Sequence, residues 1–246
     1  MRKLFIAFTL ILFLGVSVVY AAELTIITEN SPPLNYKKNG KIIGVSTELV
    51  QEIMRRTNKV YPIKVMPWAR GYALALKKPN VVLYSTVRTR SRENLFKWVG
   101  PIATLKWVLF AKSGSGLKIS NWDDAKKVGS IGTYIRDARE LMLKARGFTN
   151  LKSAPDSLTN LKKLMADRID LWVVGENEGY LLAKQNGFSP SDLEKVFVIR
   201  EVNLYIAFSK STSDTIVNVW RKAFGEMIDD GFVQKTWDKW AKLISF

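Results

Sequence analysis

Three arginines, Arg88, Arg90 and Arg92, follow an apolar run from Val81 to Val87 that is typical of a buried strand. A guanidinium group is a planar fork of N–H donors that binds a carboxylate through two hydrogen bonds, most strongly where a cleft excludes water. Arginines at alternate positions also suit a solvated basic edge. The residues alone therefore leave two interpretations, a carboxylate-binding site and an exposed surface.

Several catalytic classes are excluded by composition, because the chain contains neither histidine nor cysteine. Without these residues there is no Ser-His or Cys-His catalysis, no zinc-thiolate site and no disulfide. A cysteine-linked lipid anchor is excluded for the same reason. We therefore expect a protein that binds rather than reacts, without a cofactor or a metal.

Two further groups of residues are candidates for ligand contacts. Gly132, Thr133 and Tyr134 lie between an expected strand and an expected helix, where free N–H groups and the helix dipole favour an anion. A Gly-Thr pair before a helix is also an ordinary cap. Tyr36, Trp68 and Tyr84 could form aromatic walls of a cleft, although buried aromatic residues usually belong to the core.

Strand-like and helix-like segments alternate along the chain, which predicts an α/β fold with mainly parallel sheets. The expected strands cover Leu24 to Thr28, Tyr61 to Val65, Val81 to Val87, Trp107 to Ala111, Lys127 to Ile131, Leu171 to Val174, Val196 to Ile199 and Tyr205 to Phe208. The expected helices lie around Leu49 to Met54, Trp68 to Lys77, after Ser120, Ile135 to Arg146, Ser157 to Ala166, Tyr180 to Gln185, Asp214 to Ile228 and Val233 to Leu243. About 225 mature residues are enough for two domains.

The first residues have the layout of a secretory signal peptide: Arg2 and Lys3, an apolar run, and small residues around Ala21. We expect cleavage after Ala21, so that residues 1–21 are removed. The formal charge of +16 then becomes +14, with the lysines scattered over every expected helix. This scatter, with export, argues against nucleic acid as a partner, whereas attraction of anionic solutes remains expected.

The order of elements and a set of short strings resemble the family 3 extracellular solute-binding proteins. The likeness runs from about Glu23 to the C-terminus. It is carried by residues 29–36 (ENSPPLNY), Gly40 and Gly44, residues 67–70 (PWAR), residues 89–93 (TRSRE), residues 98–101 (WVGP) and residues 167–172 (DRIDLW).

The resemblance implies the type II periplasmic binding protein fold, with two α/β lobes joined by two hinge crossings and the ligand held between them. Residues 22–103 and 205–246 would form lobe 1, and residues 104–204 would form lobe 2. Contacts from both lobes to a ligand would stabilise a closed form.

For the site, the resemblance implies that Arg92 binds a ligand carboxylate, because it matches the arginine of the family's Thr-x-x-Arg string. The main chain of Ser85 and Val87 would bind the ligand's amino or carboxylate group. The loop at Gly132 would hold the other side of the carboxylate.

One position departs from the family, because Gly175 stands where the usual aspartate binds the ligand ammonium. Glu176 or Glu178 is the candidate replacement for that aspartate, with Glu29 contributing from lobe 1, while a surface position is the ordinary expectation for Glu178. A carboxylate without an α-amino group is the alternative ligand.

The expected function is therefore capture of an amino acid or small carboxylate in the periplasm by a free monomer, and delivery to an ABC permease. Two alternatives stay open. One is an exported cyclohexadienyl dehydratase-like enzyme with Glu176 or Glu178 as the general acid. The other is a ligand-sensing module for a membrane receptor.

Overall fold

The structure, a computed structural model, describes residues 23–243, so the expected signal peptide lies outside the described residues. The strands are β1 Thr25–Thr28, β2 Tyr36–Lys38, β3 Lys41–Ile43, β4 Ile63–Val65, β5 Val81–Val87, β6 Phe96–Lys112, β7 Ile131–Tyr134, β8 Leu151–Ala154, β9 Leu171–Gly175 and β10 Leu193–Ser209. The helices are α1 Val45–Arg56, α2 Trp68–Lys77, α3 Trp122–Lys127, α4 Ala138–Ala145, α5 Ser157–Met165, α6 Glu176–Gln185, α7 Asp214–Asp229 and α8 Phe232–Leu243, with 3-10 turns η1 Arg90–Leu95 and η2 Pro190–Asp192.

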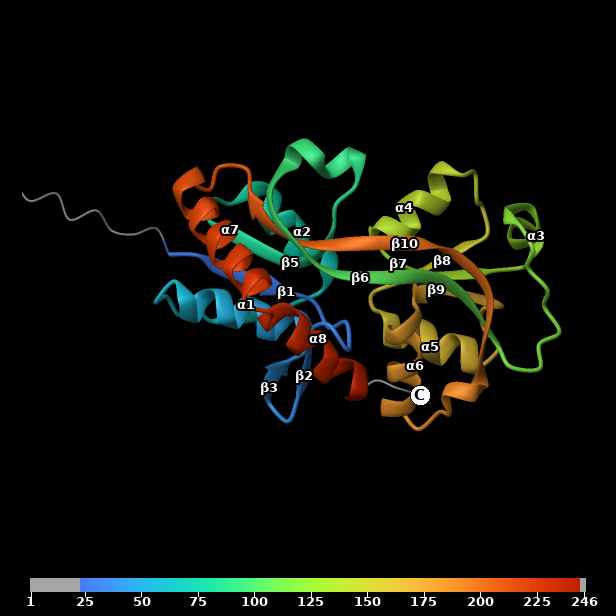
Figure 1. Cartoon of the computed structure of the whole chain (residues 1–246). Coiled ribbons are helices and arrows are strands. Elements are labelled where there is room, and N and C mark those ends of the chain that lie inside the picture. Colours follow the sequence, from blue (N-terminus) through green and yellow to red (C-terminus); the bar gives the residue numbers. More distant parts are fainter. Residues whose placement is uncertain (1–22, 244–246) are drawn as a thin grey trace, which may run out of the picture.

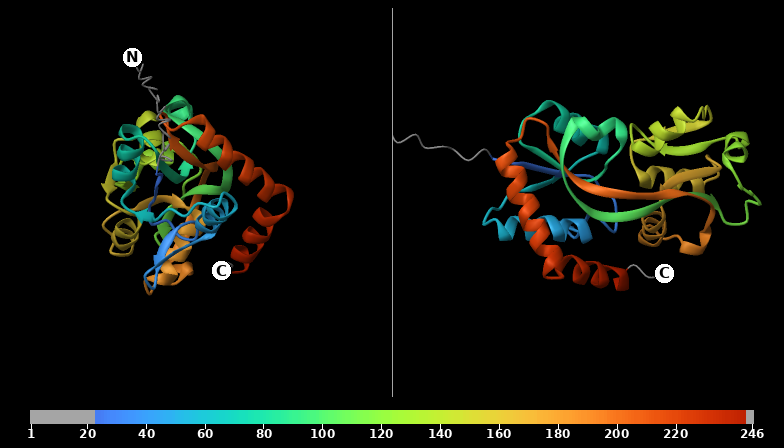
Figure 2. Two further views of the ribbon diagram at one scale, coloured as in Figure 1. Left: turned by 90° about the vertical axis from the view of Figure 1, so that its left-hand side faces the viewer. Right: turned by 45° about the horizontal axis from the view of Figure 1, so that its top comes forward.

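The elements gather into two groups placed side by side (Figures 1 and 2). Lobe 1 contains β1 to β5, α1, α2, α7 and α8, and lobe 2 contains α3 to α6 with β7 to β9. One sheet in the order β4-β1-β5-β10-β6-β9-β7-β8 runs through both lobes. The expected α/β fold of two lobes is therefore present.

The two long antiparallel strands β6 and β10 pass from one lobe to the other, so each crossing between the lobes is a continuous strand (Figure 1). Ala103 pairs with Leu204 in this ladder, at the level of the lobe boundaries predicted from the sequence. The hinge position itself stays a prediction. The segments expected as separate strands at Val196 to Ile199 and Tyr205 to Phe208 belong to one strand, β10.

Each side of the sheet in lobe 1 has its own core, because successive strand residues point to opposite faces. Ile26, Val82 and Phe208 pack toward α1 and α7, whereas Leu83 and Ala207 pack toward α2. Burial of a leucine- or valine-sized side chain contributes about 1.5–3 kcal/mol. The two cores fix the sheet, and with it the loops at its edge near lobe 2.

Lobe 2 repeats this pattern on the far parts of β6 and β9. Phe110 and Trp172 pack with α5 and α6, and Leu109 and Val173 pack with α3 and α4. The helices α4 and α6 thereby lie on opposite faces of this part of the sheet, and both bring their first turns toward lobe 1.

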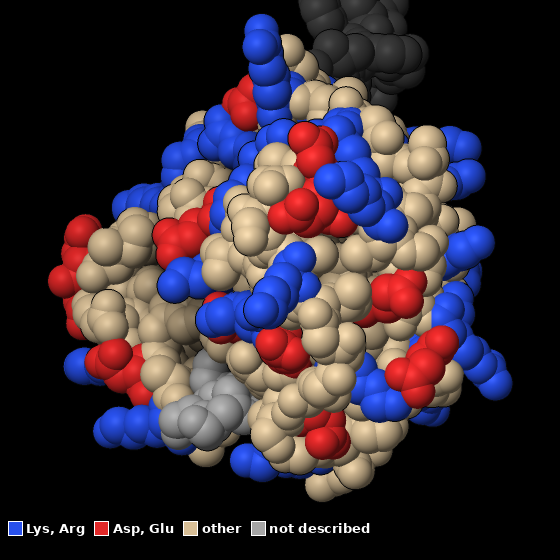
Figure 3. Space-filling model, turned by 90° about the vertical axis from the view of Figure 1, so that its right-hand side faces the viewer, with Lys and Arg blue, Asp and Glu red and all other residues tan. Residues whose placement is uncertain are grey.

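The surface charge is spread out, as the sequence predicts. On the face shown in Figure 3, Lys and Arg side chains are interspersed with Asp and Glu and with uncharged residues. Among residues 23–243, no helix has the length and apolar character needed to span a membrane.

Candidate ligand-binding cleft

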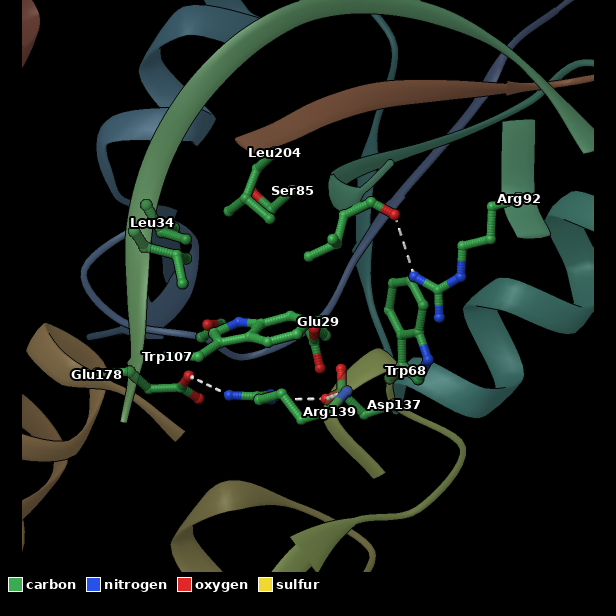
Figure 4. A pocket seen from close by; sticks show the side chains of 13 residues that line it. Glu29, Leu34, Trp68, Ser85, Arg92, Trp107, Asp137, Arg139, Glu178 and Leu204 are labelled. Carbon is green, nitrogen blue, oxygen red and sulfur yellow. Dashed lines mark hydrogen bonds and ion pairs between the residues drawn. The ribbon is translucent and has the colours of Figure 1, made fainter. Parts of the chain in front are cut away.

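A small cavity, partly open to solvent, lies between the lobes beside the crossing strands. Both lobes contribute to its wall (Figure 4). The lining residues are Glu29, Ser31, Leu34, Trp68, Ser85, Val87, Arg92, Leu105, Trp107, Asp137, Arg139, Glu178 and Leu204.

Arg92 enters this cavity from η1 and is only 3% exposed. Its guanidinium lies 4.9 Å from the ring centroids of both Trp68 and Tyr72, and one terminal nitrogen donates to the carbonyl of Val87 at 3.2 Å. The other terminal nitrogen, Nη2, is buried and has no hydrogen-bond partner. Since a buried donor without a partner costs about 1–3 kcal/mol, the site is built to receive an acceptor.

The neighbouring arginines differ from Arg92. Arg88 is exposed, forms an ion pair with Glu93 at 2.5 Å and lies over the ring of Tyr205 at 5.3 Å. Arg90 is exposed and is not among the residues that line this cavity. Only one of the three arginines considered from the sequence therefore faces the cavity.

Ser85 has a backbone φ of +61°, a conformation that costs a non-glycine residue roughly 1–3 kcal/mol. The pairing of β5 with β10 shifts register beside it, between Tyr205 and Ala207. Its hydroxyl donates to Asn35 Oδ1 at 2.5 Å, which fixes the turn. The strand is thereby interrupted where Ser85 and Val87 line the cavity, and a main-chain role for both remains a prediction.

Direct contacts between the lobes converge on Trp68 and Tyr134. The Trp68 main-chain N–H donates to the Tyr134 hydroxyl at 2.8 Å, and the indole N–H donates to the Arg136 carbonyl at 3.1 Å. The Tyr134 hydroxyl also lies near the Glu29 carboxyl and interacts with it electrostatically. These bonds join lobe 1 to lobe 2, so the structure is a closed form of the cleft.

Lobe 2 contributes a buried group of three charges, Asp137, Arg139 and Glu178. Arg139 Nε lies 2.6 Å from Asp137 Oδ1, and its Nη1 lies 3.4 Å from Glu178 Oε2. Ser157 donates a hydrogen bond of 2.7 Å to the second oxygen of Glu178. Nearby acids hold the pKa of Arg139 above its usual range, mainly through Asp137 and then Glu178, despite its burial.

Glu29 follows β1 and faces this group from lobe 1 (Figure 4). Glu29 is half-buried and lines the cavity. Burial raises the pKa of its carboxyl to about 8, and the negative charges of Asp137 and Glu178 act in the same direction.

Glu178 stands close to where the family's aspartate would place its carboxylate. A Cβ added to Gly175 would lie 3.5 Å from Glu178 Oε2, and Glu178 is 7% exposed. The ordinary expectation of a surface position for Glu178 is wrong, because its carboxylate is buried against Arg139 and Ser157 of the same lobe. Glu176 instead forms an ion pair with Lys195 and does not line the cavity.

Besides Glu176 and Tyr134, four residues considered from the sequence lie away from the cavity lining. Gly132 and Thr133 belong to the interior of β7, where a Cβ on Gly132 would come within 2.4 Å of Ile169. Tyr36 packs edge-on against Trp240 at 6.4 Å, and the hydroxyl of Tyr84 bonds that of Thr47 at 2.9 Å, both in lobe 1 cores. The sequence argument also missed Asp137 and Arg139, although their place at a helix start could have indicated them.

The chain matches known proteins over most of its length. The family model described as bacterial extracellular solute-binding proteins, family 3, matches residues 24–243. A probable histidine-binding protein of Campylobacter jejuni is 25% identical over 211 residues, covering 82% of this chain and 78% of the relative.

Solved structures agree with this assignment at the level of fold. An ancestral arginine-binding protein bound to arginine has a TM-score of 0.79 at 21% identity, covering 89% of this chain and 97% of that one. A histidine kinase sensor domain with similarity to periplasmic binding proteins has a TM-score of 0.80 at 18% identity, covering 89% and 96%. The chain belongs to the family 3 bacterial extracellular solute-binding proteins.

Proposed function

We propose that this protein captures an amino acid or a related small carboxylate in the cleft between its lobes, in the periplasm, and delivers it to an ABC permease. The family consists of extracellular solute-binding proteins, and the relative from Campylobacter jejuni is described as a probable histidine-binding protein. Arg92, Ser85, Val87, Trp68, Tyr134, Glu29 and Glu178 are the proposed contact residues.

One observation carries this proposal: the buried Arg92 lines the cavity between the lobes, and its Nη2 donor has no hydrogen-bond partner among the described residues. A solute carboxylate supplies the missing acceptor and the missing negative charge at once. Such a pair is strong because the arginine fork and the carboxylate match in geometry and water is excluded.

The contacts between the lobes suggest how binding leads to delivery. Trp68 lies beside Arg92 and also holds Tyr134 and Arg136 of lobe 2. A solute on Arg92 would touch both lobes and so favour the closed form over an open one. We propose that the permease recognises the closed form.

A thermal-shift scan with the twenty L-amino acids tests the binding function. A solute at 100 times its dissociation constant adds about 2.7 kcal/mol of stability, which corresponds to roughly 5 to 11 °C in the melting temperature. We expect at least one amino acid to reach this range with the wild-type chain and to lose most of the shift with Arg92→Ala. A scan without any shift would contradict the proposal.

The surroundings of the two proposed proton donors support binding over catalysis. Glu178 is held by Arg139 and Ser157 as an ion-paired acceptor, and Glu176 lies outside the cavity with Lys195. We therefore propose binding without chemistry. Formation of an aromatic product from prephenate or arogenate would overturn the proposal of binding without chemistry. The same assay tests whether the carboxyl of Glu29 acts as a proton donor.

Transport and sensing differ in the membrane protein that receives the solute-loaded form, and the residues of this chain do not distinguish them. The sensor-domain similarity is 18% in sequence and supports the fold alone. We propose transport, and the experiment is uptake of the bound amino acid by cells that carry or lack the gene. Unchanged uptake together with a changed transcriptional response to that amino acid would favour the sensing alternative.

A further inference from the structure

A second cavity adjoins the cleft, and we call it the side chamber. Four residues line both cavities: Ser31, Leu34, Leu105 and Glu178. The rest of the chamber wall is made by Pro32, Pro33, Thr104, Gly175, Asn177 and Trp237. Leu34 and Glu178 lie across the cleft from Arg92 (Figure 4), so a solute held at Arg92 would extend toward this chamber.

Much of the chamber wall is hydrocarbon. Pro33 and Leu34 are buried, and Leu105 and Trp237 are half-buried. The indole N–H of Trp237 already donates to the carbonyl of Ile102 at 3.2 Å, so the polar atom of this ring is not left for a solute.

The polar side chains of the wall are engaged elsewhere or lie at its margins. Both carboxylate oxygens of Glu178 have partners within lobe 2. The hydroxyl of Thr104 donates to Asn203 at 2.8 Å, Asn177 is exposed, and Ser31 belongs to the boundary shared with the cleft. A hydroxyl or amide of a solute would therefore lose water in the chamber without gaining an equivalent partner.

Gly175 keeps the side chamber open. A Cβ at this position would lie 3.5 Å from Glu178 Oε2 and 3.7 Å from Leu105 Cδ1, so a side chain here would begin in the chamber wall. The aspartate that the family resemblance leads us to expect would bring a carboxylate to the same place. Glycine leaves this space to the solute.

We propose that the side chamber receives the aliphatic end of the solute, so that the cleft prefers acids with a short hydrocarbon chain to acids of equal length that end in a hydroxyl or an amide. This inference rests on the proposed binding function. It concerns the far end of the solute and applies with or without an α-amino group. Because Pro33 belongs to lobe 1 and Gly175 to lobe 2, an aliphatic group in the chamber touches both lobes and favours closure.

Two pairs of solutes of equal size test the proposal by calorimetry. Norvaline and homoserine differ in a terminal methyl against a terminal hydroxyl, and pentanoate and 4-hydroxybutanoate repeat the comparison without the α-amino group. In whichever pair binds, we expect the methyl-ended member to bind about 10-fold more tightly or better. Along the series alanine, 2-aminobutyrate, norvaline and norleucine, or the same acids without the amino group, affinity should rise about fourfold per methylene until the chamber is full.

Gly175→Ala narrows the chamber by one methyl group. The backbone φ of Gly175 is −69°, which alanine adopts without strain, and the added Cβ makes only ordinary contacts. We expect the best-bound chain length to become one carbon shorter, while the shortest acid of the series keeps its affinity. Gly225→Ala, in α7, is the matched control, because its added Cβ would have no described atom within 4 Å.

Leu105→Ala should have the opposite effect, because it removes three carbon atoms from the wall shared by the two cavities. We expect the best-bound chain to become longer. A merely structural defect would weaken all solutes alike and leave the best chain length where it was. Ile199→Ala is the control, since Ile199 is a half-buried residue of β10 that lines neither cavity.

The possible failures are distinguishable. Equal or tighter binding of the hydroxyl-ended member in a pair that binds would overturn this inference and leave the binding function intact. An unchanged best chain length in both Gly175→Ala and Leu105→Ala would do the same, as would binding of a polar amino acid without measurable binding of norvaline or pentanoate. If none of the twenty amino acids and no member of either pair binds, both proposals fail.

Discussion

Where the two lobes meet, their charged side chains differ in whether they form ion pairs. Lobe 2 pairs its own, because Arg139 is held by Asp137 at 2.6 Å and by Glu178 at 3.4 Å. In lobe 1, by contrast, neither Arg92 nor Glu29 takes part in an ion pair with another residue of the described range 23–243. The comparison suggests that lobe 1 recognises the solute, while lobe 2 supplies a rigid wall that closes over it.

This division separates stability from binding. The charges of lobe 2 are bonded within that lobe, so they persist whether the cleft is open or closed. The charges of lobe 1 find partners only when a solute arrives. Substitutions in the two lobes should therefore change different measurements.

The largest effect is expected in lobe 2. Arg139→Met leaves Asp137 and Glu178 as buried acids without a base, which lowers the free energy of unfolding by about 3–5 kcal/mol at pH 7. Urea denaturation measures it. Arg146→Met, at an exposed arginine of the α4 C-cap, should cost less than about 1 kcal/mol. Equal values for the two variants would show that the buried group does not stabilise lobe 2.

Arg92 should affect binding next most strongly. Arg92→Ala removes a charge-assisted contact and should weaken binding by about 2–5 kcal/mol. Because the side chain also packs on Trp68 and Tyr72, Arg92→Lys serves as a second variant that keeps the charge but loses the fork. Calorimetry measures both, with the exposed Arg90→Ala as the control. Unchanged affinity in both variants would remove Arg92 from the site.

The closure contact at Tyr134 should have a smaller effect. Tyr134→Phe removes the acceptor of the Trp68 N–H, but only in the closed form, so binding should weaken by about 1–2 kcal/mol. Since closure alone is affected, the melting temperature of the protein without solute should stay the same. A lower melting temperature with unchanged affinity would indicate a structural role instead.

The smallest effect is expected far from the cleft, at Glu52 of α1. Its bonds to Arg55 at 2.7 Å and Arg56 at 2.8 Å hold the pKa of Glu52 down to about 2. A lowered acid pKa stabilises the fold above the unfolded value near 4.5, and this stability is lost as pH falls toward 2. After allowance for solvent screening, Glu52→Gln should cost about 1 kcal/mol at pH 7.

Chemical denaturation at pH 7 and at pH 2.5 measures this difference. The difference in the free energy of unfolding between Glu52→Gln and the wild type should be smaller at the lower pH. Solute affinity at pH 7 should stay unchanged. The same difference in the free energy of unfolding at both pH values would show that the ionised Glu52 carboxylate does not stabilise the fold.

Local signals in the sequence predicted the regular elements well. Pro67 before and Pro79 after the helix at Trp68 to Lys77 mark its ends, and the structure has α2 at the same residues. The apolar run from Val81 to Val87 is β5. In both cases residues close in sequence decide the outcome, as expected for caps and buried strands.

The sequence-based prediction failed where contacts between residues distant in sequence determine the structure. The strand expected at Lys127 to Ile131 lies instead at Ile131–Tyr134, because pairing with Leu151 and Leu171 sets its register. That shift moved Gly132 and Thr133 from a loop into a strand interior and hid Asp137 and Arg139. The burial of Glu178 depends likewise on Arg139 and Ser157, which are distant in sequence and which spacing along α6 does not reveal.

The most direct test of the account is a crystal structure of this chain with its amino acid bound. We predict the solute carboxylate within hydrogen-bonding distance of Arg92 Nη2, about 2.7–3.0 Å, and the ammonium group facing Glu29. A solute bound away from Arg92, or outside the cleft between the lobes, would contradict the account.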